Sequence, residues 1–157
     1  VDGDRLTVSG QLTLASTERL DRLLEEHGDL STLVLGDISV ADDVTTLLQK
    51  GTLIRSTGLS TEVAPGVTLT GDAVYLFLGG ITRTLGADAG LAVDGWQTPA
   101  GAAARLPRDH PAHSERLDYV RRMLGAEDFY WFTLEGPGEM PHPMTPAEMR
   151  ELGVVTD

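Results

Sequence analysis

Residues 71–80 read GDAVYLFLGG, with an unbroken apolar run from Ala73 to Leu78 between Gly71-Asp72 and a Gly-Gly pair. A short apolar run between turn residues predicts a buried segment, and we expect a helix that starts after Asp72. The backbone N–H groups of Gly71 and Asp72 could then point at an anion, as they do at other helix starts. A lone Gly-Asp pair is common before helices, so a plain helix start is the simpler interpretation.

Strands and helices alternate on both sides of this run. Before it, the pattern predicts a strand from Arg5 to Val8 closed by Gly10, a helix from Ser16 or Thr17 to His27, a strand from Thr32 to Leu35, a helix from Asp42-Asp43 to Gly58, and a strand from Ser60 to Val63. After it, the pattern predicts strands from Ile81 to Thr84 and Leu91 to Val93, and helices from Glu115 to Leu124, Asp128 to Leu134 and Thr145 to Gly153. This alternation favours an α/β class with mostly parallel strands.

The composition bounds the possible functions. The chain has 157 residues, 24 acidic and 12 basic side chains, and a formal charge of −12, which fits one ordinary domain. No Lys/Arg-rich stripe could meet phosphates, so we expect no nucleic-acid partner, and the negative charge would repel anionic membranes. The absence of cysteine excludes disulfides and thiolate zinc sites, and no apolar run approaches the roughly 20 residues of a membrane helix. The chain starts at Val1 without an initiator Met, which suggests a trimmed or processed protein.

The C-terminal half contains a loop candidate and an aromatic block. Residues 95–111 are rich in Gly, Ala and Pro, so we expect a flexible, exposed loop there, followed by a helical part at residues 113–152. Residues 129–132 read FYWF, and one helix face can turn only about half of these rings toward its own core. We therefore expect the others to lie in a contact between subunits, unless the loop folds back over them.

Two further sites have competing interpretations. His110 and His113 have a spacing that could bind a metal, but Pro111 lies between them and no third ligand is indicated, so we expect surface or capping histidines and no metal site. Asp94 stands at a strand end next to Gly95 and Trp96, where it could be a buried acid in a cleft. An exposed turn residue is the default interpretation of Asp94.

Seven segments then occur in a recognisable order. They are LVLGDI at 33–38, LIRSTGLST at 53–61, YLFLGG at 75–80, PRDHP at 107–111, LDY at 117–119, DFYWFTL at 128–134 and MTPAE at 144–148. In this order, over about residues 5–156, the chain resembles the Clp-protease/crotonase superfamily, and more narrowly its uncharacterised, often extracytoplasmic Clp-like branch. The resemblance implies one domain over residues 1–157, built as a spiral of ββα units. It also implies an extracytoplasmic location and assembly into trimers, hexamers or larger rings.

The resemblance also implies where a catalytic site should lie. Active Clp-like peptidases have a serine at the start of the helix that leads into the FLGG-type segment, and this position is Gly71 here. The histidine base normally follows a later strand, at the position of Asp94. The glycine-containing turn of the oxyanion hole corresponds to Ser39, Val40 and Ala41. Loss of one oxyanion donor alone costs about 100-fold to 1000-fold in rate, and loss of both nucleophile and base removes covalent acyl transfer.

Three residues could substitute for the lost groups. Thr70 precedes the nucleophile position, but a shift of one residue turns its side chain by roughly 100°, away from the attack line. Asp72 and Asp94 could act as an acid/base pair, as carboxylates do in crotonase-type enzymes, if both faced one apolar cleft. A ligand pocket beside Trp96 is a further possibility. Nothing in the sequence indicates a coenzyme A site, and we expect no cofactor.

The sequence therefore favours a Clp/crotonase-like α/β domain whose serine-peptidase site has decayed. Such a pseudoenzyme would act in oligomeric assembly or bind a protein or small molecule. A trimer or hexamer is the expected homo-oligomer, with a dimer as the fallback. The alternative function is a hydrolase or crotonase-type lyase that uses Asp72 and Asp94.

Overall fold

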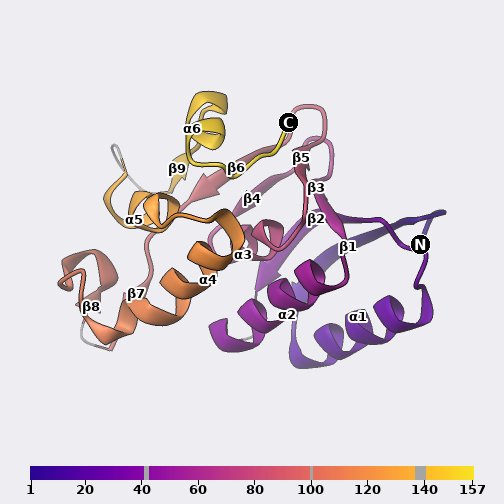
Figure 1. The fold of residues 1–157 in the computed structure, drawn as a ribbon, viewed down its shortest axis with the longest axis horizontal. Helices are drawn as coiled ribbons and strands as arrows, with labels where there is room; N and C mark the ends of the chain where they lie inside the picture. The colour runs from indigo at the N-terminus through magenta and orange to yellow at the C-terminus, as the bar shows by residue number, and fades with distance from the viewer. Residues whose placement is uncertain (41–42, 100, 137–140) are drawn as a thin grey trace.

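The computed structural model describes residues 1–40, 43–99, 101–136 and 141–157, and it shows a four-stranded and a three-stranded sheet with helices around them, together with a separate two-stranded hairpin (Figure 1). The larger sheet has the order β1-β2-β3-β5 with every pair parallel, and comprises β1 (Arg5–Leu12), β2 (Thr32–Val40), β3 (Ser60–Val63) and β5 (Arg83–Leu85). In the smaller sheet, β6 (Gly90–Val93) pairs in parallel with β4 (Thr68–Thr70) and antiparallel with β9 (His142–Pro143). The predicted α/β class with mostly parallel strands is confirmed.

In the part of the chain that the structure describes, six α-helices cover these sheets. They are α1 (Leu14–Glu26), α2 (Val44–Ser56), α3 (Ala73–Leu78), α4 (Ser114–Leu124), α5 (Asp128–Glu135) and α6 (Pro146–Glu151). In Figure 1, α1 and α2 lie side by side below the larger sheet, and an ion pair between Lys50 and Asp21 joins them. Helices α5 and α6 gather around the smaller sheet at the other end. Within the described residues, no helix has the length and apolar character needed to cross a membrane.

The core forms where α3 passes between the sheets. All residues of α3 are buried, and Phe77 and Leu78 are fully so, because the helix is apolar on every side. Leu33 and Leu35 on the central strand β2 are also fully buried, as is typical of parallel strands covered on both faces. The apolar run at residues 73–78 is therefore a core helix, as the sequence predicts.

The first helix begins earlier than the sequence suggests. Thr13, not Ser16 or Thr17, is its N-cap, and the Thr13 side chain accepts the Ser16 N–H while the Ser16 hydroxyl accepts the Thr13 N–H. This reciprocal capping box fixes the start at Leu14. Strand β1 correspondingly extends to Leu12 instead of closing at Gly10.

Local capping chemistry is confirmed at two other helices. The Asp43 carboxylate accepts the Thr46 N–H at 2.8 Å and starts α2, which holds the pKa of Asp43 below its ordinary value. Thr145 and Glu148 form the predicted capping box of α6. The N-cap of α5 is Glu127 rather than Asp128.

The segment at residues 95–111 is more regular than expected. Strands β7 (Gln97–Thr98) and β8 (Gly101–Ala102) form a hairpin, and short 3₁₀ turns follow at Ala103–Arg105 and Pro111–His113. Ala103 is fully buried, and its N–H donates to the Trp96 carbonyl at 2.9 Å. Most of the described residues of this segment are exposed, as the sequence predicts, but they form a hairpin and 3₁₀ turns instead of an irregular loop. The flexibility of the segment stays a prediction.

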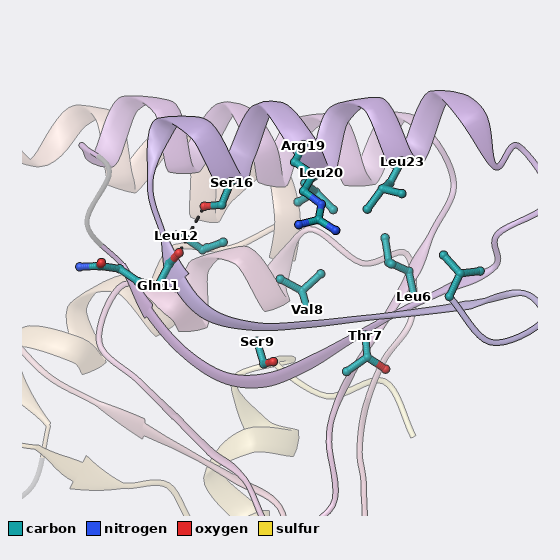
Figure 2. Close-up of a pocket in the computed structure, with 11 residues that line it drawn as sticks. Leu6, Thr7, Val8, Ser9, Gln11, Leu12, Ser16, Arg19, Leu20 and Leu23 are labelled. Atoms are coloured by element: carbon teal, nitrogen blue, oxygen red, sulfur yellow. Dashed lines mark hydrogen bonds between the residues drawn. The ribbon is translucent and has the colours of Figure 1, made fainter.

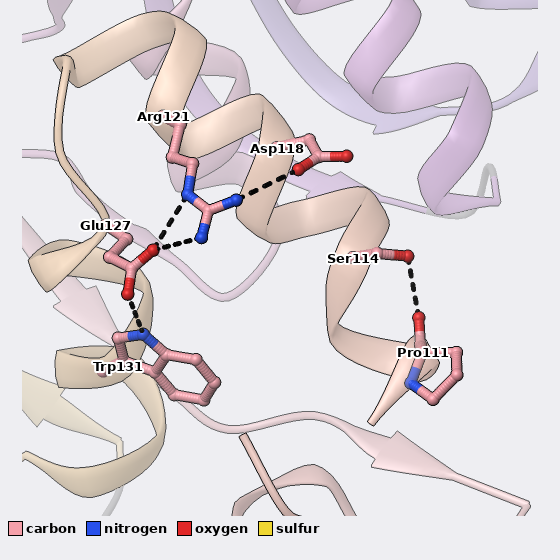
Figure 3. Close-up of polar contacts among 6 residues, drawn as sticks. All are labelled: Pro111, Ser114, Asp118, Arg121, Glu127 and Trp131. Carbon is pink, nitrogen blue, oxygen red and sulfur yellow. Dashed lines mark hydrogen bonds and ion pairs between the residues drawn. The ribbon is translucent and has the colours of Figure 1, made fainter. Parts of the chain in front are cut away.

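Side chains fix the junction between α4 and α5 (Figure 3). Helix α4 ends at Gly125, whose φ of 77° is a conformation that favours glycine. Arg121 donates from Nε to the Glu127 carboxylate at 2.8 Å, and the Trp131 indole donates to the same carboxylate at 3.3 Å. These donors lower the pKa of Glu127, and they orient α5 so that its aromatic residues face the body of the domain.

Candidate functional site

The predicted nucleophile and base positions follow the same ends of two paired strands. Strand β4 pairs in parallel with β6, and Thr70 lies opposite Ala92. The chain then continues into Gly71-Asp72 on one side and into Asp94 on the other. The structure therefore brings together the two segments that the sequence singles out, at the carboxyl ends of neighbouring parallel strands, where α/β proteins commonly place their sites.

Gly71 occupies a backbone position that suits glycine. Its φ is +57°, and a Cβ atom built there would have no other atom within 4 Å. Thr70, the last residue of β4, is exposed. A side chain at position 71 would thus have room, at the cost of a left-handed backbone conformation of about 1–2 kcal/mol.

The two carboxylates of this region do not form a pair. Asp94 is exposed, which agrees with its default interpretation as a turn residue and excludes the buried-acid alternative. Asp72 is half-buried and turns toward Arg116, with its Oδ1 atom 3.7 Å from an Arg116 guanidinium nitrogen. The two acids therefore have different environments and different partners.

Arg116 and Trp96 lie beside Asp72. The Arg116 side chain is only 10% exposed, and its Cζ atom lies 3.9 Å from the centroid of the Trp96 ring. Such a stacked guanidinium is held by both its charge and its flat face. Trp96 thus packs against an arginine of α4, where the sequence analysis placed a possible ligand pocket.

Sequence reasoning did not identify Arg116, although its spacing carried a signal. Arg116 follows His113 by three residues and precedes Val120 by four, and all three side chains are buried. A cation on the apolar face of a helix needs a partner inside the protein, because burial of an unpaired charge is costly. The partner, Asp72, is 44 positions away and could not be inferred from local pattern.

Behind Trp96 lies a buried histidine. His113 Nδ1 is 2.6 Å from the hydroxyl of Tyr130, and the Trp96 indole donates to the same hydroxyl at 3.3 Å. His113 Nε2 and Arg116 Nε are both buried without a hydrogen-bond partner in the part of the chain that the structure describes. Buried polar atoms without a partner are uncommon in folded proteins and are usually satisfied by water or a ligand.

The two histidines of the 107–113 segment have separate roles. His110 Nδ1 accepts the Ala112 N–H at 3.1 Å and caps the second 3₁₀ turn, whereas His113 is buried. His110 is a capping residue, as expected. His113 is buried and its side chain caps no helix, so the expectation of a surface or capping residue is wrong there. Among residues 1–40, 43–99, 101–136 and 141–157, no cluster of three or more His, Cys, Asp or Glu side chains could hold a metal ion.

The aromatic block at residues 129–132 is packed within the chain. Phe129, Tyr130 and Trp131 are buried, and Phe132 is half-buried. The His113 ring meets two of these rings edge-on, and Arg108 covers Trp131 at 4.5 Å from its centroid. The 95–113 segment therefore satisfies these rings, and the expectation that half of them must enter a subunit contact is wrong.

The predicted oxyanion segment is a strand, not a turn. Ser39 and Val40 are the last residues of β2 and pair with Gln11 and Leu12 of β1. Ala41 lies outside the described residues. Ser39 and Val40 therefore do not form the turn whose N–H groups the resemblance assigns to an oxyanion hole.

A second histidine lies near Asp94 and was not predicted. His142 of β9 pairs with Val93, and its Nε2 atom lies 3.0 Å from the Glu148 carboxylate. Glu148 also completes the capping box with Thr145, and these contacts hold its pKa below the ordinary value. The Glu148 carboxylate therefore mainly caps α6, and its contact with His142 is an additional one.

Neutralising the exposed acid should change little. We expect Asp94→Asn to alter the free energy of unfolding by less than about 0.5 kcal/mol, as for other exposed positions without partners. Asp72→Asn is the matched comparison, and we expect a loss of about 1 kcal/mol because Arg116 would lose its anionic neighbour. Urea unfolding at neutral pH measures both values. A clear stabilisation by Asp94→Asn would contradict the exposed placement of this side chain.

Comparisons with known proteins bear on the fold. Neither the protein-family models nor the curated proteins gave a match to this chain. Among solved structures, the 1510-N membrane-bound stomatin-specific protease superimposes with a TM-score of 0.61 at 14% sequence identity, over 96% of this chain and 76% of the protease chain. A second structure of that protease, in complex with a substrate peptide, gives a TM-score of 0.59 at 15% identity, over 96% of this chain and 72% of the other.

Enoyl-CoA hydratase from Bacillus anthracis is similar to the same degree. Its TM-score is 0.59 at 14% identity, and the likeness covers 97% of this chain and 65% of the hydratase. A peptidase and a hydratase thus share this architecture with the chain, and at such identities the likeness concerns the fold alone. The chain is a single α/β domain that resembles the Clp-protease/crotonase fold, with its ββα units.

Proposed function

We propose that this chain is a catalytically degenerate Clp/crotonase-like domain that acts by binding a partner or ligand rather than by serine-peptidase chemistry. The observation that carries the proposal is the pairing of Asp72 with Arg116 under Trp96, next to Gly71. A peptidase would need a nucleophile at position 71 and an open face beside it. Here the nucleophile position has no side chain, and the neighbouring acid is already bound to a cation.

The other catalytic positions support the same proposal. Asp94, at the base position, is exposed and has no basic nitrogen that could deprotonate a hydroxyl at position 71. Ser39 and Val40 belong to a strand, so their N–H groups do not form a preorganised oxyanion turn. The alternative, acid/base chemistry by Asp72 and Asp94, would require both carboxylates to face one apolar cleft, whereas one is exposed and the other contacts Arg116.

Labelling with a fluorophosphonate probe tests the proposal. We expect no adduct on any serine or threonine, because among the described residues no serine or threonine hydroxyl is hydrogen-bonded to a histidine, with a known serine hydrolase as the positive control. Intact-mass and peptide mass spectrometry measure the result. An adduct on Thr70 or Ser39 would overturn the proposal.

The double substitution Gly71→Ser with Asp94→His is the companion test. We expect a folded protein, destabilised by about 1–2 kcal/mol because position 71 has a positive φ. Ester hydrolysis by this variant, absent from the unsubstituted protein, would support a decayed site. Hydrolysis by both proteins at equal rates would place the activity elsewhere and contradict the proposal.

The proposal includes assembly into a homo-oligomer as one mode of binding. A trimer or hexamer, or a dimer, would need an apolar contact surface, and in the described part of the chain the large exposed hydrophobic residues are Val1, Leu14 and Ile81. These are scattered along the sequence, and single exposed residues are normal on monomers. Light scattering decides the matter, since a monomer has a mass of 16.8 kDa.

A further inference from the structure

Arg116 is a buried cation whose hydrogen-bonding capacity is unused. Its side chain is only 10% exposed, and it makes no hydrogen bond to any residue that the structure describes. The nearest anionic atom, Asp72 Oδ1, is 3.7 Å from a terminal nitrogen, which is too long for a hydrogen bond. A guanidinium has five N–H donors, and buried donors are rarely left without an acceptor. An acceptor is therefore missing beside Arg116.

Other arginines of the chain do not share this state. Arg83 is buried to a similar degree, and it donates to three backbone carbonyls at 2.7 to 2.9 Å. Arg19 is exposed beside the groove between β1 and α1, where water satisfies its donors (Figure 2). Arg116 combines burial with unused donors, and this combination points to a ligand.

Stacking on Trp96 leaves the donors of Arg116 free. The Trp96 ring covers the flat face of the guanidinium, with its centroid 3.9 Å from the Cζ atom. The N–H groups lie in the plane of the guanidinium, so they point sideways, past the ring. Trp96 therefore fixes the orientation of this side chain without satisfying it.

The Asp72 carboxylate is also unused. It precedes α3 but does not cap that helix, and it makes no hydrogen bond to another residue in the described part of the chain. The Asp72 side chain is 39% exposed, so it can be reached from outside. Gly71 precedes it, and a Cβ atom built there would have no other atom within 4 Å. An acceptor and a row of donors thus lie side by side, with open space next to them.

The charges of this pair indicate which ligands it accepts. An anion on Arg116 would bring a second negative charge close to Asp72, in a chain whose net charge is already −12. A cation on Asp72 would meet Arg116 in the same way. A neutral group that carries a donor next to an acceptor satisfies both side chains without this repulsion.

A primary carboxamide is such a group. Its oxygen and nitrogen are about 2.3 Å apart, and one N–H lies on the same edge as the carbonyl oxygen. Two hydrogen bonds of about 2.9 Å that diverge slightly reach partner atoms 3.7 Å apart. A backbone peptide group does not fit, because it is trans and its N–H and C=O point in opposite directions.

We propose that Asp72 and Arg116 bind a primary carboxamide. The amide donates an N–H to the Asp72 carboxylate, and its oxygen accepts from the Arg116 guanidinium. This inference rests on the proposed function, since it names the ligand chemistry for the region beside Gly71. A glutamine side chain of a partner protein and a small free amide both offer this chemistry, and the experiment separates them.

Nuclear magnetic resonance on nitrogen-15-labelled protein tests the proposal. The chain has two indole N–H signals, from Trp96, which stacks on Arg116, and from Trp131, which bonds Glu127 and serves as the internal control. We expect benzamide to shift the Trp96 signal saturably, with a dissociation constant below about 10 mM. Benzoate lacks the N–H, and N-methylbenzamide directs its N–H away from the carbonyl, so each should bind about fivefold more weakly or worse.

A variant of Asp72 should reverse the preference. Asp72→Ala removes the acceptor and the negative charge together, so benzamide should bind about fivefold more weakly and benzoate about tenfold more tightly. The gain for benzoate cannot result from unfolding. Asp118→Asn removes one negative charge from an exposed position of α4, on a different face from Arg116, and should change both affinities by less than about twofold.

A blocked Gly-Gln-Gly tripeptide identifies the source of the amide. Tighter binding of the tripeptide than of benzamide would assign the site to a protein side chain, and the reverse would assign it to a small amide. The inference would be overturned by no saturable Trp96 shift with either probe up to about 20 mM, by equal shifts with all three aromatic probes, or by an unchanged preference in Asp72→Ala. A fluorophosphonate adduct would overturn the proposed function instead, so the two failures are distinguishable.

Discussion

Replacing Gly51 with alanine is expected to lower the free energy of unfolding by about 3 kcal/mol, although the same change stabilises an ordinary exposed helix by about 0.5–1 kcal/mol. Gly51 lies in α2, and a Cβ atom built there would be 1.8 Å from the hydroxyl of Tyr119 and 2.7 Å from its Cζ atom. Tyr119 cannot move away easily, because it is fully buried and its hydroxyl donates to the Tyr75 carbonyl at 2.6 Å. Urea unfolding followed by circular dichroism measures the change.

The backbone of Gly51 is also in close contact with the end of α3. A Cβ atom at Gly79 would lie 2.5 Å from the Gly51 carbonyl oxygen, so the backbones of α2 and the end of α3 are in direct contact. The helix that carries Gly51 therefore cannot shift toward α3 to relieve a clash with Tyr119. An added side-chain atom costs most stability where the surrounding backbone cannot shift to make room for it.

A double-mutant cycle distinguishes this clash from a loss of helix stability. Tyr119→Phe alone should cost about 1 kcal/mol, the value of its hydrogen bond to Tyr75. Combined with Gly51→Ala, it should recover part of the loss, because the atom at 1.8 Å is gone while the ring carbon at 2.7 Å remains. Gln49→Ala, at an exposed position of the same helix, should change stability by less than about 0.5 kcal/mol. Strict additivity of the two core substitutions would contradict the proposed contact.

Gly51 also shows where sequence reasoning succeeds and where it ends. The helical spacing of apolar residues predicts α2, and the Asp43 cap is read correctly because capping is chemistry between residues three apart. The tyrosine that makes Gly51 necessary lies in α4, and no local pattern connects the two. The parallel order of the strands was predictable from alternation, whereas the contacts between helices were not.

The same difference between local and long-range contacts explains which parts of the candidate site could be predicted. Gly71 and Asp94 were placed in one site by the family resemblance alone, because strand β4 was not predicted; the structure pairs β4 with β6. The partner of Asp72 could not be predicted, since Arg116 reaches it from a helix that begins 42 residues later. The aromatic block was misjudged for a related reason: its rings are covered by the 95–113 segment, which periodicity alone describes as a loop. Contacts between residues close in the sequence could be predicted, whereas the burial of one segment by another far along the chain could not.

Alkaline pH is expected to unfold the protein in one steep transition well above pH 10. The chain has three tyrosines, and Tyr75, Tyr119 and Tyr130 are all buried. Burial raises the pKa of each above the ordinary value of 10, since a buried phenolate is poorly solvated. The folded protein therefore keeps three protons that the unfolded chain releases.

The sign of the effect follows from this difference in proton binding. A raised folded-state pKa contributes stability that is complete below about pH 10 and is lost as the pH rises beyond it, at about 1.4 kcal/mol per pH unit for each tyrosine. Arg83 acts in the opposite direction, because burial lowers its pKa to about 10 and the unfolded chain then binds the extra proton. The three tyrosines and the opposing arginine together lower the free energy of unfolding by about 3 kcal/mol per pH unit.

Tyrosinate absorbance and far-ultraviolet circular dichroism, measured on the same samples from neutral to high pH, test this expectation. Both signals should change together, because no tyrosine ionises until the chain unfolds, and Tyr75→Phe should make the transition less steep by one proton. Tyr75 is the preferred choice: its hydroxyl contacts the Thr133 side chain, whereas the hydroxyl groups of Tyr119 and Tyr130 bond the Tyr75 carbonyl and the rings of His113 and Trp96. A separate absorbance change near pH 10, equal to one tyrosine and without loss of helical signal, would show that at least one of these rings is open to water. It would also contradict the packing of α4 and α5 on which the closed arrangement of Trp96, His113 and Tyr130 depends.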